Sequence, residues 1–370
     1  MEELLRGVLG MDIQSLVMLG VGGLLIYLAI AKNYEPVLLL PMGFGCMLAN
    51  IPFSSAIGAE GALTVLYNFG IKTELFPLLI FVAIGAMIDF GPLLKNPRML
   101  LFGGAAQFGI FFTITFAALC GFTLKEAAAI GIIGAADGPT SIFVAGQFAP
   151  HYLAQISVAA YSYMALVPII QPPVMRLLTS KAERMIRMPY EEHGITKPVL
   201  VLFPILVTVI AGILVPESVA LVGFLMFGNL LRVSGVTDRL SQSAQNELAN
   251  LVTILLGITI GGVMKGSTFL TIETIMIIGM GLIAFVFDTA GGVLFAKFMN
   301  LFSKNKINPL VGAAGISAFP MSARVVQREA QKADPQNFIL MHSISANVGG
   351  QIGSIIAGGL VLALVKSLVG

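Results

Sequence analysis

The chain alternates between long apolar stretches and short polar ones. The apolar stretches cover residues 15–31, 36–48, 56–70, 75–88, 99–121, 127–149, 152–178, 198–214, 218–231, 248–264, 269–302, 308–326 and 337–365. A helix needs about 20 residues to cross the hydrocarbon core of a bilayer. The pattern therefore predicts an all-α polytopic membrane protein with about ten to twelve membrane segments, counted as full or half crossings.

One polar stretch, residues 176–197, divides the chain nearly in half. It is mainly basic and contains Arg176, Lys181, Arg184, Arg187 and Lys197 against Glu183, Glu191 and Glu192. Basic loops of membrane proteins lie predominantly on the cytoplasmic side. We therefore expect an N-terminal half over residues 1–175, a cytoplasmic linker over 176–197 and a C-terminal half over 198–370.

The composition agrees with a membrane protein. Hydrophobic residues make up 57% of the chain and charged residues only 11%, and the mean hydropathy is +0.93. Soluble domains are usually about 25% charged. The net charge is only +2, and the basic residues lie in short loops, so nucleic acid is not an expected partner. The expected surroundings are a lipid bilayer.

An acidic residue interrupts the apolar stretch 127–149. Asp137 lies in the sequence Gly-Ala-Ala-Asp-Gly-Pro-Thr-Ser-Ile, residues 134–142, and a carboxylate at the centre of a bilayer costs about 2.5–3.5 kcal/mol on insertion scales. Gly138 and Pro139 predict a helix break there, which frees backbone carbonyl groups. With the hydroxyl groups of Thr140 and Ser141, these oxygens predict a site for a small hard cation such as Na⁺.

The sequence around Asp137 is weakly similar to a region of the second half. A shift of 181 residues aligns Gly131, Gly134, Pro139, Ser141 and Val144 with identical residue types, and residues 84–87 resemble 260–263 at a slightly different shift. This similarity predicts two inverted structural repeats whose broken, re-entrant helices meet at the membrane midplane. Asp137 would then face the polar residues of the second repeat, which are Asn308, Ser317, Ser322 and Arg324.

These residues resemble a known family. Gly134–Ile142, together with residues 308–312, Ser317 and Arg324, is similar to the membrane β subunit of the sodium-pumping, biotin-dependent decarboxylases of oxaloacetate, methylmalonyl-CoA and glutaconyl-CoA. The resemblance covers essentially the whole chain. It implies a translocase that decarboxylates carboxybiotin, consumes a proton and exports Na⁺. It also implies carboxyltransferase and biotin-carrier partners, a small single-span membrane subunit and a homo-oligomer within the complex.

The resemblance also assigns roles to particular residues. It implies catalytic roles for Tyr163, Arg324 and Ser317, since a proton donor assists decarboxylation and a guanidinium group suits a carboxylate. It implies carboxybiotin contacts for Arg324, Asn308 and Gly312. The expected Na⁺ ligands are Asp137, Asn308, Ser317, Thr140 and Ser141.

Other interpretations remain open. Asp137 could be a structural carboxylate paired with a cation, Tyr163 a residue of the interfacial aromatic belt, Asn308 a helix start, and Arg324 a side chain that reaches the surface. Ser317, Thr140 and Ser141 could serve close helix packing. A sodium-coupled symporter or a cation/proton antiporter would share the broken helices and Asp137 but would need no biotin protein. A membrane scaffold would need neither Asp137 nor Arg324.

Overall fold

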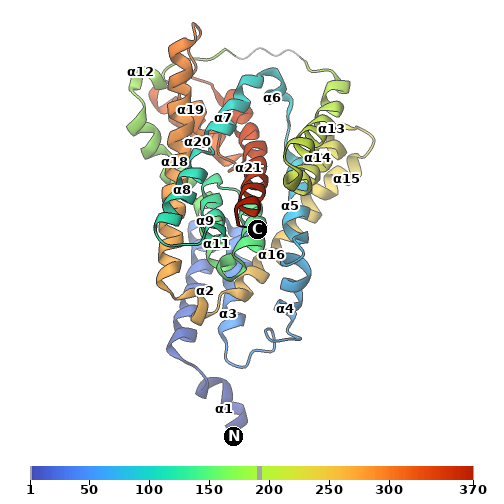
Figure 1. Ribbon diagram of the computed structural model, residues 1–370, viewed down its shortest axis with the longest axis vertical. Coiled ribbons are helices and arrows are strands. Elements are labelled where there is room, and N and C mark those ends of the chain that lie inside the picture. The colour runs from blue at the N-terminus through green and yellow to red at the C-terminus, as the bar shows by residue number, and fades with distance from the viewer. Residues whose placement is uncertain (1, 190–193, 370) are drawn as a thin grey trace.

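The computed structural model describes residues 2–189 and 194–369 and is built of helices without strands in that part of the chain. Glu191, Glu192 and His193 of the predicted linker lie outside the described residues. Figure 1 shows an elongated bundle, with the N-terminus at one end and the C-terminus near the middle. All-helical architecture is the expected solution in a bilayer, because a helix satisfies its own backbone hydrogen bonds.

The first half contains α1 (Glu2–Leu9), α2 (Ile13–Lys32), α3 (Pro36–Asn50), α4 (Ala62–Leu66), α5 (Leu75–Met87), α6 (Gly91–Lys95), α7 (Leu100–Ala105), α8 (Phe108–Leu119), α9 (Leu124–Gly131), α10 (Gly138–Phe148) and α11 (Leu153–Leu178). Short 3₁₀ and π turns join several of these helices: η1 (Tyr67–Ile71), η2 (Pro97–Met99), η3 (Ile132–Ala135) and η4 (Pro150–Tyr152).

The second half contains α12 (Lys181–Arg184), α13 (Lys197–Leu214), α14 (Val219–Val233), α15 (Asp238–Ser243), α16 (Ala249–Val263), α17 (Gly266–Phe269), α18 (Ile272–Phe302), α19 (Leu310–Ala313), α20 (Met321–Ala333) and α21 (Leu340–Val369). The turns η5 (Pro216–Ser218) and η6 (Ala244–Leu248) precede α14 and α16.

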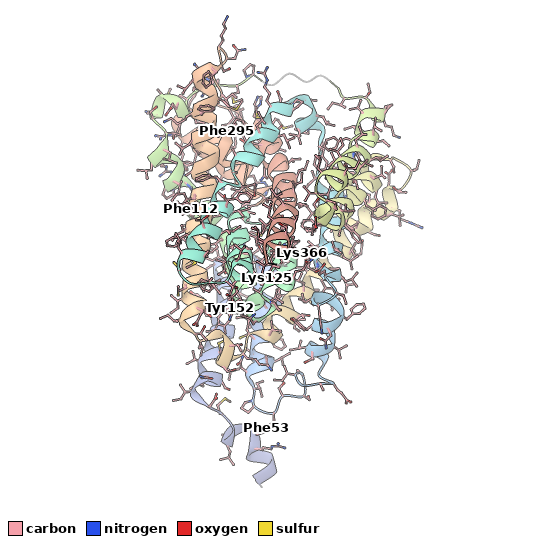
Figure 2. The ribbon with its side chains drawn as sticks, viewed as in Figure 1. Phe53, Phe112, Lys125, Tyr152, Phe295 and Lys366 are labelled. Carbon is pink, nitrogen blue, oxygen red and sulfur yellow. The ribbon has the colours of Figure 1, made fainter. Side chains whose placement is uncertain are left out.

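The helices pack in two groups. In one group, α3 packs against α2 and α16, and α14 packs against α5 and α13. In the other, α18 packs against α8, α11 and α19, and α21 packs against α7 and α20. Aromatic rings line the outer edge of the second group, where Phe112 of α8, labelled in Figure 2, stacks on Phe287 of α18 with 4.1 Å between ring centroids.

The number of full-length spans is lower than the predicted number of segments. Within residues 2–189 and 194–369, eight helices are long and apolar enough to cross a membrane, or nine if the bent pair formed by 62–71 and 75–87 is one span. The stretch 36–48 forms the shorter apolar helix α3. The stretches 127–149 and 308–326 are each interrupted: the first helix of each ends at Ala136 or Ala314, and a proline, Pro139 or Pro320, lies where the next helix begins.

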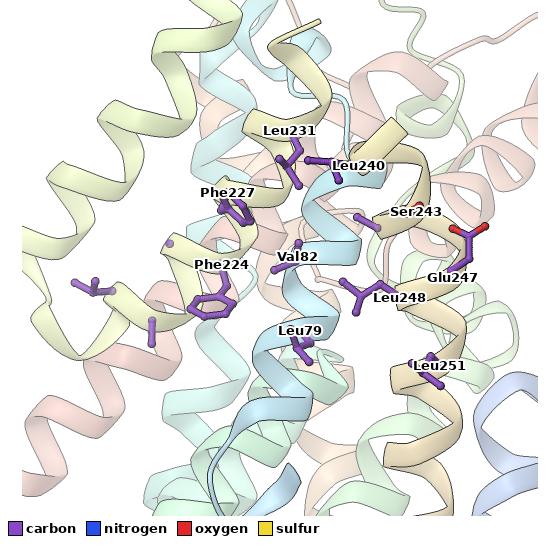
Figure 3. A pocket seen from close by; sticks show the side chains of 14 residues that line it. Leu79, Val82, Phe224, Phe227, Leu231, Leu240, Ser243, Glu247, Leu248 and Leu251 are labelled. Carbon is purple, nitrogen blue, oxygen red and sulfur yellow. The ribbon is translucent and has the colours of Figure 1, made fainter. Parts of the chain in front are cut away.

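An apolar groove lies between α5, α14 and α16 (Figure 3). Side chains of Leu79 and Val82 form its floor, and Phe224 and Phe227 of α14 and Leu251 of α16 form its walls. The carboxylate of Glu247 points away from the groove. None of the predicted site residues lines it, so the groove is separate from the candidate site.

Candidate functional site

The predicted break in the first half lies immediately before Asp137. Helix α9 begins with a capping box of Thr123 and Glu126 and tightens into the 3₁₀ turn η3. Ala136 then adopts a left-handed conformation with φ of 51°, which ends the helix. Asp137 is the N-cap of α10, and Pro139 occupies the first turn, where its missing N–H leaves no bond unmade. The local sequence thus places a carboxylate between two helix ends.

Asp137 is buried, with 2% of its surface exposed, and four donors surround its carboxylate. The Oδ2 atom accepts hydrogen bonds from Thr140 Oγ1 at 2.7 Å, Ser354 Oγ at 2.8 Å and Gln351 Nε2 at 3.1 Å. The Oδ1 atom accepts the backbone N–H of Thr140 at 3.3 Å, and Ser141 Oγ donates to the Asp137 carbonyl at 2.8 Å. Such donors favour the ionised carboxylate without supplying a counter-charge.

The second break lies beside the first. Between α19 and α20 the chain is non-helical around Ser317, whose backbone N–H donates to the carbonyl oxygen of Ala135 at 3.0 Å. The Ser317 hydroxyl donates to the Gly350 carbonyl at 2.9 Å, and Asn347 Nδ2 donates to the Ile316 carbonyl at 2.6 Å. Helix α21 therefore holds both breaks, and we define the break cluster as Asp137, Thr140, Ser141, Ser317, Gln351 and Ser354.

Four predicted Na⁺ ligands thus belong to one cluster, whereas Asn308 lies apart. Asn308 Nδ2 donates to the backbone carbonyls of Arg184 and Ile186 in the linker, at 2.9 Å each. Asn337 Nδ2 donates to the same two carbonyls at 3.1 Å. In this conformation Asn308 fixes the linker to the start of the second broken segment.

Apart from Ser317, the predicted catalytic and carboxybiotin-binding residues lie outside the break cluster. The Tyr163 hydroxyl on α11 donates to the carbonyl of Ile278 on α18. Gly312 packs directly against the backbone of Gly292, so that a Cβ there would overlap the Gly292 carbonyl. Arg324 is exposed on α20 and forms no ion pair with any residue of the described chain. Its guanidinium group is therefore available to a ligand.

The sequence interpretation missed three residues at Asp137. Gln351 and Ser354 belong to α21. The ring of Tyr161 on α11 lies against Gly138, and its buried hydroxyl has no hydrogen-bond partner in the part of the chain that the structure describes. A signal for the first two was present. Asn347, Gln351 and Ser354 recur at helical spacing within the last apolar stretch, which forms a polar stripe on one face of the helix.

Ion pairs attach the linker region to α20. Arg176 contacts Glu329 through two hydrogen bonds of 2.7 and 2.9 Å, and Lys332 contacts the same carboxylate at 2.7 Å. Arg187 donates to Asp334 at 2.7 Å, and this hydrogen bond holds the pKa of the Asp334 carboxyl below its usual value. Helix α20 and Arg324 therefore lie on the side of the predicted cytoplasmic linker.

Comparison with known proteins identifies the family. Residues 14–365 match the family described as the Na⁺-transporting oxaloacetate decarboxylase beta subunit. The chain belongs to this family. It is 54% identical to the glutaconyl-CoA decarboxylase subunit beta of Acidaminococcus fermentans, over 94% of this chain and 92% of that protein. It is 52% identical to the methylmalonyl-CoA decarboxylase subunit beta of Veillonella parvula, over 98% and 96% respectively.

An oxaloacetate decarboxylase beta chain from Klebsiella pneumoniae is 44% identical, over 98% of both proteins. The family predicted from the sequence is thereby confirmed. Membership supports the role of a decarboxylase sodium-pump subunit rather than that of an independent symporter or antiporter. The apolar helices and the family together indicate a multi-pass integral membrane protein.

Proposed function

We propose that this β-subunit chain decarboxylates carboxybiotin, delivered by a biotin carrier, and exports Na⁺ through the break cluster. One observation carries the proposal: a buried carboxylate lies where two broken segments meet, in a chain of the sodium-transporting decarboxylase family. Broken helices at the centre of a membrane transporter are the usual place for coupling ions, because they present carbonyl and carboxylate oxygens without exposing them to lipid.

The break cluster suits Na⁺ as the transported ion. Asp137 supplies a charged oxygen, and the hydroxyl groups of Thr140, Ser141, Ser317 and Ser354 supply neutral ones. Each hydroxyl now donates to a nearby acceptor and retains lone pairs that a cation would attract. Binding of Na⁺ to Asp137 would neutralise the buried charge and lower the cost of moving this segment within the membrane.

We propose that carboxybiotin binds on the side of α20 that faces the linker. Arg324 is exposed there and has no ion-pair partner among the described residues, and a guanidinium fork is suited to a carboxylate. Asn308 and Gly312 lie at the start of the same broken segment, and Ser317 connects that segment to Ala135. Tyr163 would be the proton donor, and it would first have to release its hydrogen bond to Ile278.

The proposed complex contains carboxyltransferase and biotin-carrier subunits, a small single-span membrane subunit and further copies of this chain. It would operate in the cytoplasmic membrane of a bacterium or archaeon, with the linker on the cytoplasmic side. The names of the relatives, which include glutaconyl-CoA, methylmalonyl-CoA and oxaloacetate decarboxylases, support a decarboxylase complex as the setting.

We also propose that residues 1–175 and 198–370 are inverted repeats joined by the linker 176–197. Matched glycine contacts support this arrangement. Gly45 of α3 packs against the backbone of α16 at Ile258 and Gly261, and Gly228 of α14 packs in the same manner against α5 at Val82 and Ala86. The pairing of α3 with α16 and of α14 with α5 is what a two-fold relation between the halves requires.

The test is decarboxylation of free carboxybiotin by the purified complex, titrated with Na⁺, for wild type and Asp137→Asn. Asp89→Asn is the matched control, because Asp89 is exposed and its carboxylate accepts a local hydrogen bond from the backbone N–H of Gly91. We expect Na⁺-dependent turnover in the wild type and in the control, and its loss in Asp137→Asn. Unchanged Na⁺ flux in Asp137→Asn, or wild-type turnover that ignores Na⁺, would contradict the proposal.

A further inference from the structure

A second acidic residue lies inside the helical bundle, outside the break cluster. Asp288 is in the middle of α18 (Ile272–Phe302), is 0% exposed, and so cannot reach the surface. Among the residues that the structure describes, no Lys, Arg or His side chain forms an ion pair with it. A buried charge without a counter-charge is costly, and an acidic residue within a membrane helix is therefore a candidate functional site.

One oxygen of Asp288 caps a neighbouring helix. Helix α8 begins at Phe108, after the chain turns at Ala106 and Gln107. The N–H groups in the first turn of a helix have no partner within it. Asp288 Oδ1 accepts one of these, the backbone N–H of Gly109. This oxygen therefore has a hydrogen-bond donor on α8.

The other oxygen faces the first break. Asp288 Oδ2 is buried and accepts no hydrogen bond from any residue in 2–189 or 194–369. It lies against Gly134 of η3, where an added Cβ would be only 2.5 Å from it. One residue before Asp288, the ring of Phe287 on α18 stacks on the ring of Phe112 on α8, so the two helices are in contact beside the carboxylate. The free oxygen is therefore enclosed, and the segment that encloses it carries Asp137 three residues later.

We propose that Asp288 is a proton-binding site, closed by the packing of η3 against α18. A proton on Oδ2 removes the buried charge while Oδ1 continues to accept from α8. Na⁺ prefers several oxygen ligands, and it suits this position poorly because Gly134, against which Oδ2 lies, has no side-chain oxygen for the ion. The carboxylate takes one proton from water and returns one to water, so the step needs no other reactant.

Two titratable groups on the segments around Asp288, Asp137 and Tyr163, form their hydrogen bonds with other residues. Asp137 follows η3, and Tyr163 of α11 packs against α18 at Gly281, two helical turns before Asp288. The contacts of Asp288 itself are with the backbone of α8 and with Gly134. Proton exchange at Asp288 therefore depends on whether water can enter between η3 and α18. The inference does not rest on the Na⁺ site proposed for Asp137.

Infrared spectroscopy of the purified complex at saturating Na⁺ tests the site. A protonated carboxylic acid has a C=O stretching band distinct from the bands of a carboxylate. We expect Asp288→Asn to remove one component of the carboxylic-acid band at neutral pH. Thr289→Val is the matched control, because Thr289 is the equally buried neighbour whose hydroxyl also has no partner. The component should persist there and in Asp137→Asn, which separates this site from the Na⁺ site.

Two further measurements test closure and guard against misfolding of the variant. In Gly134→Ala, the new methyl group would force η3 away from Oδ2. After transfer to deuterated water, the C=O band of protonated Asp288 should then shift roughly tenfold faster than in the wild type. In the wild-type complex, dicyclohexylcarbodiimide, which modifies protonated carboxyl groups in apolar surroundings, should label Asp288 less as the pH rises. An unchanged spectrum in Asp288→Asn, unchanged exchange in Gly134→Ala, or absence of label at every pH would overturn the proposal.

Discussion

Removing the hydroxyl group of Ser354 is expected to weaken Na⁺ binding without disturbing the fold. Ser354 Oγ donates to Asp137 Oδ2 at 2.8 Å, from a helix that lies 217 positions further along the chain. A hydrogen bond to a charged group contributes about 1.5–3 kcal/mol, and each 1.4 kcal/mol corresponds to a tenfold change in affinity. The full loss would therefore weaken binding by about ten- to a hundredfold.

The lower end of this range is the expected value for Ser354→Ala. Three other donors remain on the carboxylate, from the backbone and hydroxyl of Thr140 and from Gln351, and they compensate in part. We expect the Na⁺ concentration for half-maximal decarboxylation to rise about tenfold, because the variant loses both a donor to Asp137 and an oxygen for the ion. The assay is Na⁺-activated turnover of carboxybiotin by the purified complex.

Ser345→Ala is the matched control for this experiment. Ser345 lies on the same helix, is equally buried, and donates only to the carbonyl of Met341 one turn earlier, at 2.8 Å. Its removal should leave the Na⁺ dependence at the wild-type value. If Ser354→Ala had the same half-saturating Na⁺ concentration as the wild type and Ser345→Ala, the assignment of Na⁺ to the break cluster would be refuted.

Two further predictions concern packing and pH. Gly138→Ala would drive a methyl group into the Tyr161 ring, whereas Gly146 on the same helix faces open space. Thermal unfolding should show about 1–3 kcal/mol of destabilisation for Gly138→Ala and little for Gly146→Ala. Equal melting temperatures of the two variants would contradict the packing. Because Arg187 lowers the pKa of Asp334, the ion pair is fully formed above about pH 4 and is lost as the pH falls through that lower value. The protection of linker amides in residues 181–189 against hydrogen exchange, corrected for the intrinsic rate at each pH, should fall below that pH in the wild type. An Arg187→Gln variant that kept the same pH dependence would count against it.

The sequence predicted the parts of the site that depend on local chemistry. A glycine and a proline beside Asp137 predict where the helix is interrupted, and the interruption places Thr140 and Ser141 near the carboxylate. Gln351 and Ser354 were missed because they reach Asp137 from positions 214 and 217 residues away, and only the polar stripe on α21 pointed to them. Contacts at such separations depend on tertiary packing rather than on residue spacing.

The prediction for Asn308 shows the same limit. The residue type is suited to an ion or a cofactor, and the sequence placed it with the second repeat facing Asp137. In the structure its amide group binds backbone carbonyls of the linker at Arg184 and Ile186. Every residue carries a backbone carbonyl, so no sequence pattern marks these acceptors. Its predicted role toward Na⁺ and carboxybiotin stays a prediction.

The position of α21 between the two breaks has a thermodynamic consequence. Asn347 binds the second break at Ile316, and Gln351, one helical turn later, binds Asp137 in the first. A ligand that changes the geometry at either break alters the same turn of one rigid helix. Coupling of this kind is reciprocal. If a ligand of the second break raises the affinity of the protein for Na⁺ by some factor, Na⁺ must raise the affinity for that ligand by the same factor. This holds even before any large movement of the halves.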